Sequence, residues 1–414
     1  MSFSPQRGWT NDPNGLIVID GNYHLFFQYY PDDIVWGPMH WGHAISKDGI
    51  NWEELPVAIY PEGNGYIFSG SAILDKNDVS GLFDGSELID NKVTLLCFYT
   101  EHNPVTGEQQ QCIAYSNDYI NFEKYKGNPV IKNTKDLPEY TKDFRDPKVF
   151  ENTVIGGFSM VVAAGPGLEF YHSKDLLHWE YTGRFSVSDY LGDGICECPD
   201  CIPIDSKWIL TLSYIPMTVS EENVSKFTDR HTMNYFVGSF DGYTFAADEG
   251  ERGNKLLDYG PDNYAMVSFA NTEEKLLMGW AENWDYVYDI PAEGSRGRMT
   301  SVRKVSLERT YKGLELSQRF IEEPEEATIP VGKTIEIELS EGKKIKIFAD
   351  DRTISVKRDR IKGTDESRWL SMEGYNCFEA DRINSGDCQI SYIKHRDLCE
   401  ILADGGCISF TVRA

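Results

Sequence analysis

Ser46-Lys47-Asp48-Gly49-Ile50-Asn51-Trp52 has a pattern, Ser-x-Asp-x-x-x-aromatic, that occurs four times in this chain of 414 residues. The other copies begin at Ser116, Ser173 and Ser239, so successive copies lie 70, 57 and 66 residues apart. Each copy follows an apolar run, and Ser and Asp commonly satisfy backbone groups in tight turns. A repeat of this period indicates stacked supersecondary units. We therefore expect each copy to be a hairpin turn whose aromatic residue packs between units.

The segments between the copies read as short strands, for example residues 23–29, 93–99 and 208–214. A four-stranded propeller blade takes about 40–50 residues, and a period of about 60 leaves room for long loops. About 315 residues at this period correspond to about five units. The sequence therefore predicts an all-β fold in which residues 1–320 form a five-bladed β-propeller.

The texture of the sequence changes after Arg319. Glu322-Glu323-Pro324-Glu325-Glu326 is acidic and contains a proline, and we interpret residues 321–326 as a linker. Short segments with alternating apolar and polar residues follow it at Thr334–Leu339, Lys344–Phe348, Thr353–Lys357, Gln389–Lys394, Leu398–Leu402 and Cys407–Val412. This pattern is typical of a small β-sandwich, which we predict over residues 327–414.

Charge and cysteine usage limit the possible partners and compartment. The net charge of −26 argues against nucleic acid and anionic membranes as partners. Residues 1–8 hold no apolar run and no stretch is long and apolar enough to span a membrane, so we expect neither a signal peptide nor a membrane anchor. The nine cysteines show no regular disulfide framework. Together these features favour a reducing, cytoplasmic location.

Cys198 and Cys201 have CxxC spacing, but the chain contains no second CxxC. A zinc site usually needs four ligands at recognisable spacing. We therefore expect ordinary buried thiols and no metal.

Three short motifs each present one carboxylate next to a proline or close to one. They are Trp9-Thr10-Asn11-Asp12-Pro13-Asn14-Gly15, Phe144-Arg145-Asp146-Pro147 and Glu197-Cys198-Pro199. Proline favours an extended conformation in the residue before it, so we expect Asp12 and Asp146 to be extended. Any one motif alone is typical of a turn. All three in one chain indicate the paired carboxylates that glycoside hydrolysis requires.

Together the three motifs resemble the signature of glycoside hydrolase family 32, which contains invertases, levanases, inulinases and sucrose-6-phosphate hydrolases. The resemblance runs from residue 9 to about residue 310, and the family's order of propeller and sandwich matches the order predicted here. It implies that Asp12 is the nucleophile, that Glu197 is the general acid/base, and that Asp146 binds fructose hydroxyls and stabilises the transition state. It implies no metal, nucleotide or organic cofactor.

Further positions fall on segments that resemble the family's sugar pocket. For each aromatic residue, packing between blades is an equally good interpretation. The substrate-binding residues that the resemblance implies are Asn11, Gln28, Trp36, Trp41, Phe68, Ser69, Arg145, Tyr264 and Trp280. Three carboxylates around one sugar repel one another, which raises the pKa of at least one of them. Because the general acid needs a proton, we expect Glu197 to be the carboxyl that holds it.

The resemblance implies a retaining enzyme that releases terminal β-D-fructofuranosyl units from sucrose or short fructooligosaccharides. A sucrose-6-phosphate hydrolase is an alternative, for which Arg230 and His231 are candidate phosphate ligands. A fructosyltransferase with the same carboxylates is a second alternative. A non-catalytic sugar-binding propeller is a third, although such a protein is expected to lose a carboxylate. The oligomeric state stays open.

Overall fold

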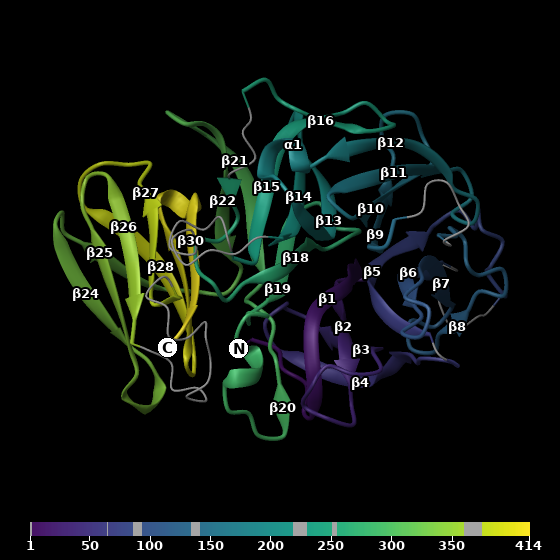
Figure 1. Ribbon diagram of the computed structural model, residues 1–414, viewed down its shortest axis with the longest axis horizontal. Helices are drawn as coiled ribbons and strands as arrows, with labels where there is room; N and C mark the ends of the chain where they lie inside the picture. Colours follow the sequence, from purple (N-terminus) through teal and green to yellow (C-terminus); the bar gives the residue numbers. More distant parts are fainter. Residues whose placement is uncertain are drawn as a thin grey trace.

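The computed structural model describes residues 2–63, 65–85, 93–133, 141–217, 230–250, 255–359 and 375–414. Within these ranges the strands form seven sheets. Five sheets follow one another in chain order around a common axis, and the last two form a separate pair beside them (Figure 1). The prediction of an all-β fold with a five-bladed propeller and a C-terminal sandwich is confirmed.

The five propeller sheets are the blades. Blade 1 contains β1 (Gly8–Ile19), β2 (Asn22–Tyr30), β3 (His40–Ser46) and β4 (Trp52–Ile59). Blade 2 contains β5 (Tyr66–Asp75), β6 (Thr94–His102), β7 (Gln109–Ser116) and β8 (Glu123–Lys124). Blade 3 contains β9 (Phe144–Glu151), β10 (Phe158–Ala164), β11 (Gly167–Ser173) and β12 (Glu180–Ser186), followed by α1 (Ser188–Leu191).

Blade 4 contains β13 (Gly194–Ile204), β14 (Lys207–Pro216), β15 (Thr232–Phe240), β16 (Phe245–Ala247) and β17 (Lys255–Leu256). Blade 5 contains β18 (Tyr264–Ser268), β19 (Leu276–Trp280), β21 (Arg303–Thr310) and β22 (Gly313–Phe320), with η1 (Val287–Asp289) in the β19–β21 connection. The sandwich sheets are β24 (Lys333–Glu338), β25 (Lys344–Ala349), β26 (Thr353–Arg358) and β27 (Cys377–Asp381), and β23 (Glu325–Ile329), β28 (Cys388–His395), β29 (Leu398–Ala403) and β30 (Ile408–Arg413). Two further 3-10 turns are η2 (Ser340–Gly342) and η4 (Asp404–Gly406).

The four copies of the repeat are the turns between the third and fourth strands of blades 1 to 4. In each copy the aspartate carboxylate accepts backbone N–H groups from the residues two and three positions later, as Asp48 does from Ile50 and Asn51 at 2.8 and 2.7 Å. Blade 5 instead turns tightly through Tyr311 and Lys312, which explains why five blades show only four copies.

The aromatic residue of the repeat packs on the preceding blade. Phe122 lies edge-on to Phe26 of blade 1, with ring centroids 5.4 Å apart. Trp179 contacts Phe98 of blade 2 in the same way at 5.7 Å. Phe245 of blade 4 likewise meets a ring of blade 3. Such edge-to-face pairs favour one inter-blade geometry in addition to burying apolar area, so the repeat both turns the chain and joins the blades.

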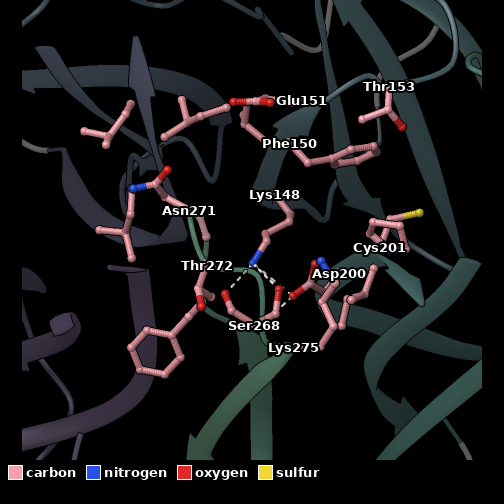
Figure 2. Close-up of a pocket in the computed structure, with 18 of the residues that line it drawn as sticks. Lys148, Phe150, Glu151, Thr153, Asp200, Cys201, Ser268, Asn271, Thr272 and Lys275 are labelled. Atoms are coloured by element: carbon pink, nitrogen blue, oxygen red, sulfur yellow. Dashed lines mark hydrogen bonds and ion pairs between the residues drawn. The ribbon is translucent and has the colours of Figure 1, made fainter. Parts of the chain in front are cut away.

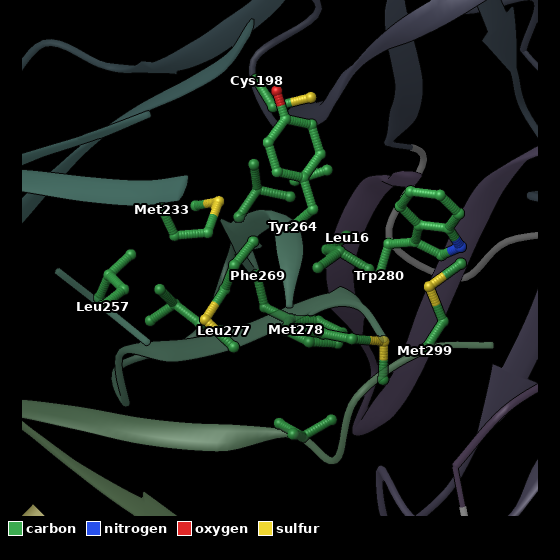
Figure 3. Packing of buried hydrophobic residues seen from close by; sticks show 14 of the residues in the cluster. Leu16, Cys198, Met233, Leu257, Tyr264, Phe269, Leu277, Met278, Trp280 and Met299 are labelled. Carbon is green, nitrogen blue, oxygen red and sulfur yellow. The ribbon is translucent and has the colours of Figure 1, made fainter. Parts of the chain in front are cut away.

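The ring closes through β20 (Ser295–Arg296), a short strand in the β19–β21 connection that pairs parallel with the start of β1. A core cluster lies where blade 1 meets blades 4 and 5, and Figure 3 shows Leu16, Met233, Tyr264 and Met278 converging there.

The sandwich meets the propeller through buried ion pairs. Arg303 at the start of β21 is completely buried and bonds Glu400 of β29 at 2.7 Å and Asp258 at 3.3 Å. Arg358 at the end of β26 is equally buried and pairs with Asp262 at 3.1 Å. The sequence analysis did not anticipate this interface, nor β23 and β27. The first two residues of β23 lie within the segment 321–326 that we interpreted as a linker.

We expect Arg303→Met to lower the free energy of unfolding by about 3–5 kcal/mol, because it leaves two buried carboxylates without their cation. The measurement is the midpoint of urea unfolding. Lys304→Met is the matched control: Lys304 pairs with Glu274 where both side chains are about half exposed, and such a pair contributes about 0–1 kcal/mol. Equal losses for the two variants would show that the interface does not depend on the buried pair.

Candidate active site

The first strands of the blades, β1, β5, β9, β13 and β18, contact one another around the axis. Each first strand also pairs with the second strand of its own blade, and every one of these pairings has a register shift. Two examples are the shifts between Ile67 and Gly70 and between Glu197 and Asp200. A bulge bends its strand and turns side chains away from the regular alternation. The ring of bulges therefore brings residues from all five blades to one point on the axis.

Asp146 shows the effect of the bulge on the backbone. Its φ is +63°, in the left-handed region, so the prediction that Pro147 keeps it extended is wrong. The N–H of Asp146 donates to the Thr100 hydroxyl at 3.0 Å, and its Oδ2 accepts the Cys198 N–H at 2.9 Å. These two contacts from neighbouring blades hold a conformation that the local sequence disfavours.

The Asp12 carboxylate is fixed on both oxygens. Oδ1 accepts a hydrogen bond from Asn11 Nδ2 at 3.0 Å, and Oδ2 accepts one from the Ser69 hydroxyl at 2.6 Å. Asn11 is itself held by Trp9 Nε1 at 2.7 Å. One rotamer of Asp12 is therefore set by donors from its own strand and from blade 2.

Glu197 is bound on both oxygens as well. Arg145 donates to Oε1 from Nε at 3.2 Å and from Nη2 at 2.9 Å, and the Tyr264 hydroxyl donates to Oε2 at 2.6 Å. The Glu197 carboxyl is therefore oriented by Arg145 of blade 3 and Tyr264 of blade 5, and the expectation that it holds the proton stays a prediction.

Burial decides where the proton of the carboxyl cluster lies. Burial raises the pKa of Asp146 to about 7; Arg145 opposes this shift, and the charges of Glu197 and Asp12 add to it. Burial also raises the pKa of Asp12, against the hydrogen bond from Ser69. The prediction that at least one carboxyl pKa is raised is confirmed at Asp146 and Asp12, but burial is the largest cause and the predicted repulsion between carboxylates adds to it.

These groups line a cavity of about 240 Å³. Nine of the predicted site residues contribute to its wall: Asn11, Asp12, Gln28, Trp36, Phe68, Ser69, Arg145, Asp146 and Glu197. Three further wall residues, Gln109, Asp143 and Trp284, were not predicted. Asp143 lies two residues before Arg145 and pairs with it at 2.8 Å, so the charged motif could have been read two residues longer. Gln109 and Trp284 carry no such signal.

The structure places the other three predicted residues behind the wall. Trp41 and Trp280 are completely buried, so we correct their assignment from sugar contacts to packing residues. Trp41 donates from Nε1 to the Phe68 carbonyl, and Trp280 packs on Trp9 and Trp284. Tyr264 is also buried, with only its hydroxyl reaching Glu197.

A second cavity, of about 400 Å³, lies along the same axis, and Figure 2 shows Lys148 and Asp200 inside it. Lys148 Nζ pairs with Asp200 at 2.9 Å and also donates to the carbonyl and hydroxyl of Ser268. Between the two cavities remains a space of only about 10 Å³, which Lys148, Asp146 and Cys198 help to line. The axis is thus blocked in its middle, and the carboxylate cavity is closed at its base.

Among the described residues there is no group of three or more His, Cys, Asp or Glu side chains arranged to hold a metal ion. The same residues include no helix of the length and apolarity needed to cross a membrane. Eight of the nine cysteines are free thiols, namely Cys97, Cys112, Cys196, Cys198, Cys201, Cys388, Cys399 and Cys407.

Comparisons with known proteins agree with this geometry. The sequence model of the Glycosyl hydrolases family 32 N-terminal domain matches residues 2–319. A levanase of Bacillus subtilis is 41% identical over 337 residues, which are 78% of this chain and 46% of that protein. An invertase of Schizosaccharomyces pombe is 38% identical over 324 residues, which are 74% of this chain and 52% of that protein. The chain thus spans about half the length of these two relatives.

Among solved structures, an exo-inulinase from Aspergillus awamori superimposes with a TM-score of 0.84 at 29% identity, covering 100% of this chain and 92% of that one. A β-fructofuranosidase from Schwanniomyces occidentalis, complexed with fructosyl-erythritol, gives 0.83 at 26% identity, covering 100% and 90%. The second of these structures has the same fold as this chain and contains a bound fructosyl compound.

We expect Asp146→Asn to stabilise the protein at pH 8. An aspartate titrates near 3.9 when unfolded and Asp146 near 7 when folded, so the folded state binds more protons between these values and the parent loses stability as pH rises through that window. The variant lacks this loss, and the difference, at most about 4 kcal/mol at pH 8, should vanish near pH 4. Urea unfolding at several pH values measures it.

Asp48→Asn is the control of opposite sign. Backbone hydrogen bonds from the repeat turn lower the pKa of Asp48, so its charge stabilises the fold at neutral pH. This variant should be less stable than the parent at pH 8. An Asp146→Asn protein no more stable than the parent at pH 8 would contradict the placement of the proton on Asp146.

Proposed function

Because the chain belongs to glycoside hydrolase family 32, we propose that it is a retaining β-fructofuranosidase that releases terminal fructosyl units from sucrose and short fructans. The observation that carries the proposal is the convergence of Asp12, Asp146 and Glu197 on one cavity that is closed at its base. A pair of carboxyl groups flanking a glycosidic bond is what this reaction requires.

Asp12 is the proposed nucleophile. Its two oxygens are fixed by Asn11 and Ser69, so the attacking atom is oriented before substrate binds. It forms a bond to the anomeric carbon of fructose while the bond to the leaving oxygen breaks, and Glu197 gives that oxygen a proton. In the second step Glu197 takes a proton from water, whose oxygen replaces Asp12 on the anomeric carbon.

The proton for the first step comes from the carboxyl cluster. Three interacting carboxyl groups titrate together, and a raised pKa at Asp146 means that the cluster keeps a proton near neutral pH. When substrate binds, a sugar hydroxyl that donates a hydrogen bond to Asp146 stabilises its carboxylate form, so that Asp146 can release the proton. In the proposed mechanism the proton then moves to Glu197, where the leaving oxygen needs it.

The closed base of the cavity supports release from chain ends. Lys148 and Asp200 block the axis below the carboxylates, so a polysaccharide cannot thread through the propeller. A sugar at the base must be a terminal one, as in sucrose and at the ends of inulin or levan.

Charge supports a neutral substrate over a phosphorylated one. Among the described residues that line the cavity, Arg145 is the only cation, and it already pairs with Asp143 and Glu197. Arg230, a candidate phosphate ligand in the sequence, is buried over the ring of Tyr375. His231, the other candidate, pairs with Asp285. Within the part of the chain that the structure describes, the residues lining the cavity therefore offer no free cation for a phosphate.

A reducing compartment such as the cytoplasm is part of the proposal. The buried free thiols of blades 2 and 4 and of the sandwich support it, because disulfides are typical of secreted proteins and rare in the cytosol.

We expect ion chromatography of reaction products to show free fructose from sucrose, kestose, inulin and levan, with sucrose-6-phosphate the poorest substrate. Asp12→Asn should lower kcat at least about 1000-fold, because it removes the attacking oxygen while keeping the hydrogen-bonding shape. Asp118→Asn, which alters an aspartate in a repeat turn on the surface, is the matched control and should retain activity.

Each other outcome points elsewhere. Longer oligosaccharides as the main product would identify a transferase, in which a sugar takes the place of water. Preference for sucrose-6-phosphate would contradict the charge argument. Sugar binding without turnover by the parent protein would overturn the enzyme and leave the binding propeller.

A further inference from the structure

His231 lies just before β15 in blade 4 and pairs with Asp285 in the β19–β21 connection of blade 5. We propose that His231, fixed by Asp285 of blade 5 and through it by Tyr375 of the sandwich, is a positioning residue for the general acid/base Glu197. This inference rests on the proposed function, and it assigns the sandwich a part in the chemistry.

The position of His231 is set by a short chain of hydrogen bonds. Its Nδ1 lies 2.8 Å from Asp285 Oδ1, with the two side chains 19% and 7% exposed. The other oxygen of Asp285 accepts the hydroxyl of Tyr375. The Asp285 N–H donates to Asn283 Oδ1 at 2.7 Å, and Asn283 in turn bonds the Pro261 carbonyl at 2.6 Å. Asp285 is therefore fixed by contacts with both domains, and its pairing with His231 fixes the imidazole in turn.

His231 reaches Glu197 through Tyr264. The imidazole lies edge-on to the Tyr264 ring, with ring centroids 5.6 Å apart and planes at 77°. The Tyr264 hydroxyl donates to Glu197 Oε2 at 2.6 Å. Burial, and then the charge of Glu197, raises the pKa of Tyr264 well above its ordinary value, so Tyr264 stays a donor at every working pH. The packing of His231 thus limits the tilt of the ring that orients the Glu197 carboxyl.

His231 also acts through its charge. Burial lowers its pKa, but the hydrogen bond and charge of Asp285 and the charge of Glu197 outweigh burial, so the pKa is raised. The raised pKa favours the imidazolium form, whose positive charge attracts the negative charge of Glu197. Among the described residues, the other titratable or charged groups that face these two residues are Arg145, Asp12, Asp146, Cys196, Cys198, Tyr264 and Asp285.

The role predicts an effect on proton transfer more than on binding. His231→Gln keeps a donor for Asp285 but removes the cation and the aromatic packing. We expect kcat for sucrose to fall about tenfold with KM within about twofold, because the proton donor is misaligned. The pH profile of kcat/KM should also differ from that of the parent, because the variant lacks a titratable group and its charge beside Glu197.

Two comparisons separate this role from a general structural one. Fructosyl fluoride needs no proton on its leaving group, so His231→Gln should slow it much less than it slows sucrose. His178→Gln is the matched control, because His178 makes the same 2.8 Å contact with Asp175 on an exposed turn of blade 3. Equal losses on both substrates, or a pH profile like that of the control, would overturn the inference.

A measurement without turnover keeps the inference testable by itself. Coupling is reciprocal, so Glu197→Gln should lower the titration midpoint of His231 by about half a pH unit, followed by NMR of the imidazole and assigned with His231→Gln. An unchanged midpoint would overturn the inference even if the enzyme is active. Absence of turnover by the parent with the midpoint shifted would instead contradict only the proposed function.

Discussion

Three carboxyl groups, one of them buried and two half-buried, lie together on the propeller axis, and the surrounding structure compensates for the cost of placing them there. Arg145, the Ser69 hydroxyl, the Cys198 N–H and the Tyr264 hydroxyl each come from an inner strand and each stabilise one carboxylate. A buried charge without such partners would be strongly destabilising. The bulged inner strands are required because regular alternation would not aim side chains from every blade at one point.

These contacts do not fully offset the cost of burying the carboxyl groups, and the uncompensated part raises the pKa of Asp146. Burial leaves Asp146 with a pKa of about 7, so the cluster holds a proton at the pH where a glycosidase must deliver one. A fully neutralised cluster would be more stable but would have no proton to give. Stability and reactivity are therefore opposed at the same atoms, as is common at functional sites.

The sandwich is joined to the propeller by specific buried contacts. Arg303 and Arg358 link it to the propeller through ion pairs that are completely buried. Asp262, the partner of Arg358, lies two residues before Tyr264, and Tyr375 bonds Asp285. Both contacts end on the segments that hold Glu197 in place. The second domain thus contacts the segments that surround Glu197.

The sequence by itself determined the blade count, the sandwich and the motif carboxylates, because turn chemistry and strand alternation are local and the motifs are short. Only the tertiary structure decided that Trp36 lines the cavity while Trp41 lies behind it, that Gln109 and Trp284 join the wall, and that Asp146 is left-handed. It also decided the pairing of His231 with Asp285. These features depend on contacts between blades far apart in the chain, and an aromatic or charged residue reads the same in sequence whichever way its strand faces.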